Sequence, residues 1–119
     1  MAELAEVPVE EVLARIEEDH LVRLAQQMVR IPSPSGEERD LARYLAGYLD
    51  AAGLRSRIHP VAVGERQSEQ VTGTLPGSGG GRSLMLCGHL DTARWESDVY
   101  RRDLWTVGPY EGLVRDGKL

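Results

Sequence analysis

The sequence predicts an α/β fold in which N-terminal helices are followed by a mixed β-sheet. Three observations lead to this prediction. Apolar residues recur with a helical period before Gly53, the pattern after Gly53 alternates as in a strand, and a continuous apolar run near Met85 is typical of a covered strand. Helices followed by such a mixture are typical of layers in which helices pack on a sheet.

The predicted helices occupy the first part of the chain. Apolar side chains at positions 9, 12, 13 and 16, and again between 21 and 29, fall on one face of a helix. Whether Asp19 begins a second helix as its N-cap or lies inside one long helix stays open. Pro32 and Pro34 end the run, because proline forces the preceding residue out of helical geometry. Residues 35–38 match a capping box for a further helix, and Gly53 suits its C-terminal end.

Strands are predicted for residues 54–59, 70–75 and 83–88. The third is apolar without alternation, so we expect a central strand covered on both faces, with Cys87 in the core. A polar loop, 64–69, separates the first two strands, and the glycine-rich segment 76–81 is short enough to join antiparallel neighbours. Asp116 and Gly117 form a pair typical of a hairpin turn.

Composition and charge argue against several function classes. A chain of 119 residues with 41% hydrophobic and 28% charged residues fits one folded domain rather than a disordered segment. The net charge of −5 and the lack of a basic block argue against nucleic-acid binding, and the apolar runs are too short for a transmembrane helix. The lone Cys87 and an acidic start unlike a secretory signal predict a cytoplasmic location.

Several candidate motifs favour structural roles. The glycine-rich segment 76–81 lacks the lysine of a phosphate-binding loop and precedes a strand instead of a helix. His20 falls in a helical segment and His59 on the polar face of a strand, which favours surface or structural roles for both. Cys87 has no basic neighbour in sequence that would activate its thiol.

His89 and Asp91 come directly after the predicted strand 83–88. Sheets of α/β proteins bind ligands at the carboxyl ends of their strands, where the loops diverge. An imidazole nitrogen there can bind a divalent metal, and a carboxylate two residues later can orient the imidazole. Because the H-x-D spacing also recurs by chance, a metal ligand and a structural pair remain equal alternatives on chemistry alone.

Five segments of the chain, including the one that contains His89 and Asp91, occur in an order that resembles a known family. They are Ile-Pro-Ser-Pro-Ser-Gly-Glu-Glu (31–38), Gly-Thr-Leu-Pro-Gly (73–77), Leu-Met-Leu-Cys-Gly-His-Leu-Asp-Thr (84–92), Trp-Thr-Val-Gly-Pro-Tyr (105–110) and Arg-Asp-Gly-Lys-Leu (115–119). Together they resemble the N-terminal part of the dinuclear-zinc metallopeptidase family that includes acetylornithine deacetylase, succinyl-diaminopimelate desuccinylase, aminoacylase and glutamate carboxypeptidase. Gln70 replaces a frequent asparagine of the family, and Ala93-Arg94 replaces its usual valine-proline pair.

The resemblance implies a metal site with assigned residues. His89 would bind one of two zinc ions, and Asp91 would be the catalytic residue that holds the imidazole of His89. In the family the ions share a bridging aspartate, and a glutamate base activates the water that attacks an amide carbonyl. The substrate would be a small N-acyl amino acid or a peptide. Cobalt or manganese stay alternatives to zinc, because ligand geometry and not one histidine selects the metal.

The resemblance also implies that residues 1–119 are the N-terminal portion of an incomplete zinc-peptidase catalytic domain. The family's bridging aspartate would follow Leu119, and a lid or dimerisation domain, through which a homodimer could form, would lie further on. We expect the chain alone to be inactive and to bind zinc weakly, because a catalytic zinc needs about three protein ligands. The alternative is a non-enzymatic α/β module that binds a partner through an exposed sheet edge.

Overall fold

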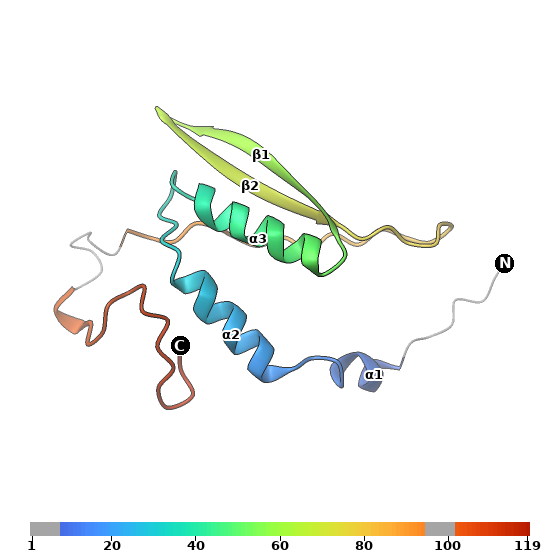
Figure 1. Ribbon diagram of the computed structural model, residues 1–119, viewed down its shortest axis with the longest axis horizontal. Coiled ribbons are helices and arrows are strands. Elements are labelled where there is room, and N and C mark those ends of the chain that lie inside the picture. Colours follow the sequence, from blue (N-terminus) through green and yellow to red (C-terminus); the bar gives the residue numbers. More distant parts are fainter. Residues whose placement is uncertain (1–7, 95–101) are drawn as a thin grey trace.

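Helices precede a two-stranded antiparallel sheet in the computed structural model, which describes residues 8–94 and 102–119 (Figure 1). The helices are α1 (Val9–Leu13), α2 (Glu18–Val29) and α3 (Arg39–Ala51), the strands are β1 (Arg55–Val63) and β2 (Arg66–Thr74), and η2 (Arg102–Leu104) is a 3-10 turn. The order of helices before strands confirms the predicted α/β class. Outside the antiparallel pair, a parallel bridge joins Pro34 to Thr92.

The first two helices are separate, which answers the question left open at Asp19. Glu17 is extended, with φ −93° and ψ 112°, and α2 begins at Glu18. Asp19 therefore lies in the first turn of α2, where a carboxylate stabilises the positive end of the helix dipole, and is not the N-cap. Within residues 8–94 and 102–119, no helix has the length and hydropathy needed to span a membrane.

The predicted capping box at residues 35–38 is wrong. Helix α3 begins at Arg39, its N-cap is Glu38, and no side chain caps its first turn. The two side chains expected to form the box have other partners. Ser35 donates to Asp91, while Glu38 accepts from the Gly36 amide and from the hydroxyl of Ser68. These three hydrogen bonds replace the ones that Ser35 and Glu38 would make in a capping box. The other end of α3 is as predicted, because Gly53 follows it with φ +84°.

The hairpin of β1 and β2 lies against α3, and the two form the packed centre of the described part (Figure 1). The register runs from Arg55 opposite Thr74 to Val63 opposite Arg66, so the predicted loop 64–69 shortens to a two-residue turn and both strands are longer than expected. On α3, Leu41 and Ala42 are buried. A Cβ atom on Gly73 would lie 3.0 Å from Leu49, which shows how closely the helix approaches the sheet.

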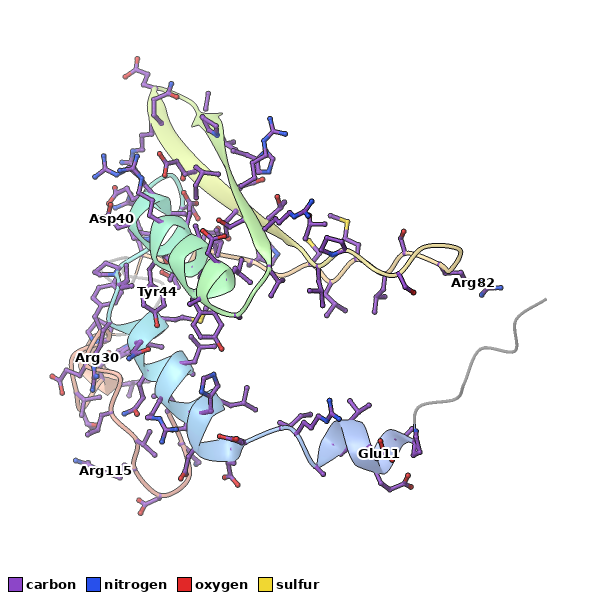
Figure 2. All side chains as sticks on the ribbon, turned by 45° about the vertical axis from the view of Figure 1, so that its right-hand side comes forward. Glu11, Arg30, Asp40, Tyr44, Arg82 and Arg115 are labelled. Carbon is purple, nitrogen blue, oxygen red and sulfur yellow. The ribbon has the colours of Figure 1, made fainter. Side chains whose placement is uncertain are left out.

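The prediction of a covered central strand at residues 83–88 is wrong for this structure. No strand is formed there, and Leu84, Met85 and Leu86 are 84%, 81% and 87% exposed. Cys87, expected in the core, is exposed as well. The chain leaves β2, reverses in the glycine-rich segment near Arg82 and returns unpaired (Figures 1 and 2). An apolar strand is buried only where neighbouring strands and helices cover it, and the described residues do not supply them.

The segment near the end of the chain lies against α2. Gln26 donates from Nε2 to the carbonyl of Gly112 at 2.7 Å, and Arg30, labelled in Figure 2, donates from Nε to the carbonyl of Glu111 at 3.1 Å. The predicted Asp-Gly turn is confirmed. Asp116 and Gly117 have φ of +51° and +71°, and Arg115 and Lys118 exchange backbone hydrogen bonds across the turn.

Candidate functional site

His89 and Asp91 are in direct contact. Nδ1 of His89 lies 3.0 Å from Oδ1 of Asp91, and the His89 side chain is 93% exposed. A carboxylate can only accept, so in the neutral imidazole Nδ1 carries the proton and donates a hydrogen bond to Asp91. The lone pair of the ring is then on Nε2, on a side chain that is open to solvent. This is the tautomer that a metal ligand bound through Nε2 requires.

A second side chain contacts the same carboxylate. The hydroxyl of Ser35 donates to Oδ2 of Asp91 at 2.6 Å, within the range of a hydrogen bond from a hydroxyl to a charged carboxylate. The Ser35 hydroxyl, followed by the His89 imidazole, lowers the pKa of Asp91 below its ordinary value. Asp91 therefore stays charged at neutral pH and accepts one hydrogen bond on each oxygen.

Backbone contacts bring these residues together from distant parts of the chain. The amide of Thr92 donates to the carbonyl of Ser33 at 2.9 Å, and the hydroxyl of Ser33 donates to the carbonyl of Leu90 at 2.9 Å. Ser33 is buried, with 1% of its surface exposed. We call residues 33–35 and 90–92, joined by these contacts, the serine bracket. It fixes the backbone on both sides of Asp91.

Charged side chains lie beside the serine bracket. Glu37 accepts from Arg94 at 2.5 Å and pairs with Arg66 at 3.2 Å. The hydrogen bond from Arg94 is the main reason that the pKa of Glu37 is lowered. Arg94 belongs to the Ala93-Arg94 pair that departs from the family pattern, so this departure places a guanidinium three residues after Asp91.

The described residues can supply one ligand of a metal site but not a complete set of ligands. Over residues 8–94 and 102–119, no three His, Cys, Asp or Glu side chains come together in a way that could bind a metal ion. In its neutral form, with Nδ1–H donating to Asp91, His89 nevertheless offers the exposed Nε2 that a zinc ligand needs. The remaining ligands of a zinc ion would have to come from residues beyond this described set.

The other two histidines each have a separate hydrogen-bond partner. Nε2 of His20 lies 2.7 Å from the hydroxyl of Tyr48, which joins α2 to α3. Nε2 of His59 lies 2.9 Å from Oγ1 of Thr72, across the hairpin. Both contacts agree with the structural or surface roles predicted for these histidines.

Three curated proteins are similar to the chain over most of its length. It is 36% identical over 98 residues to the succinyl-diaminopimelate desuccinylase of Methylobacterium sp. (strain 4-46). It is 30% identical over 107 residues to the acetylornithine deacetylase of Photorhabdus laumondii and 31% identical over 105 residues to that of Proteus mirabilis. The chain is a relative of these desuccinylases and deacetylases. The family resemblance predicted from the motifs is thereby confirmed.

The matches cover most of this chain but a small part of each relative. They include 81–82% of this chain but 23–25% of each relative, so the chain spans about a quarter of the length of the curated relatives that it matches. A continuous stretch of 81–82% of this chain must include the middle of the chain, and therefore Ser33, Ser35, His89 and Asp91. No protein-family model and no solved structure matches the chain.

Sequence reasoning missed Ser33 and Ser35 as parts of the site. It used Ser35 for a capping box and gave Ser33 no role. The two serines lie 57 and 56 positions from their partners Leu90 and Asp91, and no local pattern reports a contact over that distance. One signal in the sequence pointed to this contact. Residues 31–38 and residues 84–92 both belong to the segments in which the chain resembles the family.

Proposed function

We propose that this chain is part of a metal-dependent amide hydrolase that removes the acyl group from a small N-acyl amino acid or cleaves a peptide. The relatives are named as a desuccinylase and as deacetylases, and both names describe the cleavage of an amide-linked acyl group. The observation that carries the proposal is the His89–Asp91 hydrogen bond of 3.0 Å, which leaves Nε2 of an exposed imidazole ready to bind a metal.

In this proposal His89 contributes one zinc ligand through Nε2, and Asp91 accepts a hydrogen bond from its Nδ1–H group. Zinc, when bound, would polarise the amide carbonyl and lower the pKa of the attacking water, and cobalt or manganese could replace it. The negative charge of Asp91 keeps the Nδ1–H tautomer and raises the basicity of Nε2. Asp91 therefore acts on the reaction through His89.

The proposed site is completed by residues outside the described ones. We propose that residues 1–119 form the N-terminal portion of a longer catalytic domain in the cytoplasm, and that homodimers form through a further domain. With one histidine ligand, the 119-residue chain should bind zinc weakly and should not hydrolyse amides. A tight, stoichiometric zinc site on the chain, measured by isothermal titration calorimetry, would contradict this part of the proposal.

The test of the proposal is hydrolysis by the full-length protein that contains the chain. N-acetylornithine and N-succinyl-diaminopimelate are the probes that the names of the relatives suggest. His89→Ala should abolish hydrolysis and lower the zinc content of the purified protein. Asp91→Asn should lower kcat/KM by about 10–100-fold without unfolding the protein. A fully active His89→Ala enzyme would overturn the assignment.

A second candidate function is an interaction module that binds a partner at a strand edge. The exposed run Leu84–Met85–Leu86 favours it, as do the two edges of the β1–β2 sheet, which pair with no further strand within residues 8–94 and 102–119. The same His89→Ala variant separates the two candidates, because a strand-pairing module needs backbone groups and would keep its binding without the imidazole.

A further inference from the structure

Asp91 has two hydrogen-bond partners, one on each carboxylate oxygen. Oδ1 accepts from Nδ1 of His89 at 3.0 Å, and Oδ2 accepts from the hydroxyl of Ser35 at 2.6 Å. The torsion that rotates an aspartate carboxylate about its own axis is soft and has no sharp minimum. One hydrogen bond therefore leaves the plane of the carboxylate free to turn, whereas a second bond to the other oxygen fixes it.

The serine that contacts Asp91 is itself fixed to the segment that carries Asp91. Ser33 bonds to Leu90 and Thr92 through its hydroxyl and its carbonyl, and both contacts are 2.9 Å long. The parallel bridge between Pro34 and Thr92 belongs to the same arrangement. The serine bracket thus holds the backbones of Ser35 and Asp91 in register, and the Ser35 hydroxyl meets Oδ2 without a long flexible side chain.

We propose that Ser35 is a positioning residue that fixes the carboxylate of Asp91 and, through it, the Nδ1–H tautomer and outward Nε2 of His89. The purpose of this arrangement rests on the proposed function, since an outward Nε2 matters for a metal ligand. The arrangement itself consists of the hydrogen bonds of Ser35 and His89 to Asp91, so it can be tested separately from that function. Nothing in the family resemblance gives this serine a role.

The chain contains a matched control for Ser35. The hydroxyl of Ser56 donates to Oδ2 of Asp50 at 2.9 Å, and like the Ser35–Asp91 bond it is an exposed hydrogen bond between a serine and an aspartate. No histidine contacts Asp50 among the described residues. Removing the Ser56 hydroxyl therefore removes the same type of bond without touching the tautomer of His89.

The test is the tautomer of His89, read from long-range ¹H–¹⁵N spectra of the 119-residue chain at about pH 8, where an ordinary histidine is neutral. The wild type should show mainly the Nδ1–H form. Ser35→Ala should shift the majority to the Nε2–H form, which a free imidazole prefers. Ser35→Thr keeps the hydroxyl and should restore the wild-type spectrum, while Ser56→Ala should leave it unchanged.

Ser35→Val separates loss of the hydroxyl from a general loss of structure. Valine has the shape of threonine without its hydroxyl, so the Thr and Val variants differ by one hydrogen-bond donor. Amide signals of β1 and β2 report whether each variant is folded. If Ser35→Val and Ser35→Ala are folded and keep the Nδ1–H form of His89, the role of Ser35 is refuted.

A zinc titration of the same samples distinguishes this proposal from the proposed function. If the tautomer follows the Ser35 hydroxyl but zinc shifts the signals of His20 or His59 and not those of His89, Ser35 positions His89 and the metal assignment fails. If zinc shifts the signals of His89 equally in the wild type and in Ser35→Ala, and the tautomer does not change, the metal assignment stands and the Ser35 proposal fails.

Discussion

At the residue level, Arg43 and Glu69 join α3 to β2 by a two-point ion pair. Nε and Nη2 of Arg43 donate to the two oxygens of Glu69 at 2.8 and 2.7 Å. These hydrogen bonds lower the pKa of Glu69 and raise that of Arg43. Because the pKa of Glu69 is lowered by folding, its contribution to stability is present above the ordinary glutamate pKa and is lost as the pH falls through the lowered value.

Glu69→Gln should therefore destabilise the fold at pH 7 and have no effect in acid. The loss at pH 7 should be small, as is usual for ion pairs at the surface. Urea unfolding followed by circular dichroism, repeated from pH 7 to about pH 3, measures the difference from the wild type. Glu65→Gln removes a charge from the turn between the strands and is the control. A Glu69→Gln penalty that stays constant over this pH range would contradict the ion-pair account.

At the level of elements, the contact between α2 and the segment containing Gly112 depends on a residue without a side chain. Gly112 has φ +57°, and a Cβ atom there would lie 2.8 Å from the backbone oxygen of Gln26. Gly47, inside α3, has no atom within 4 Å of the corresponding position. The two glycines should therefore respond to alanine in opposite directions.

Gly112→Ala should release the Glu111–Gly112 segment from α2, because alanine in the left-handed region costs about 1–2 kcal/mol and its Cβ atom also meets the Gln26 carbonyl. Gly47→Ala should stabilise α3 by up to about 1 kcal/mol, since alanine is a better helix former. Hydrogen exchange of the Gly112 region and urea unfolding of the Gly47 variant test the pair. If the Gly112→Ala variant keeps its contacts with α2, the position of the segment does not depend on the close approach of Gly112 to Gln26.

Elements supported by local pattern were predictable, and contacts between distant residues were not. The helical period before Gly53, the alternation after it and the Asp116–Gly117 turn all depend on neighbours in sequence, and the structure confirms each. The capping box failed because Ser35 has Asp91 as a partner, and the strand at 83–88 failed because nothing in the described part covers it. The pairing of His89 with Asp91 was predictable from their spacing, whereas the serine bracket joins distant parts of the chain and could be found only from the folded structure.

At the level of the whole molecule, the chain is more extended than a compact domain of its size. Its radius of gyration is 18.0 Å, compared with about 13–14 Å expected for a compact chain of this length. Among the described residues, the buried hydrophobic side chains are Leu41 and Ala42, while Leu84, Met85 and Leu86 are exposed. The apolar run at 84–86 thus contributes little to the stability of this chain.

Leu86→Ala should consequently change the free energy of unfolding by less than about 0.5 kcal/mol, as at an ordinary surface position. Leu41→Ala, at 4% exposure, should cost about 2–5 kcal/mol or leave the chain unfolded. Urea unfolding of both variants against the wild type measures the two effects side by side. A loss of several kcal/mol in Leu86→Ala would mean that residues 83–88 are covered in solution, as the sequence pattern alone predicts.

In the proposed function, His89, oriented by Asp91, is a metal ligand of a deacylase-type hydrolase. The most direct test is a zinc titration of the 119-residue chain, followed by the imidazole ¹⁵N signals of its three histidines. His20 and His59 are internal controls, because Tyr48 and Thr72 already contact their Nε2 atoms. We predict weak binding that shifts the Nε2 signal of His89 first and that disappears in His89→Ala. Binding at His20 or His59 with the signals of His89 unmoved would contradict the account.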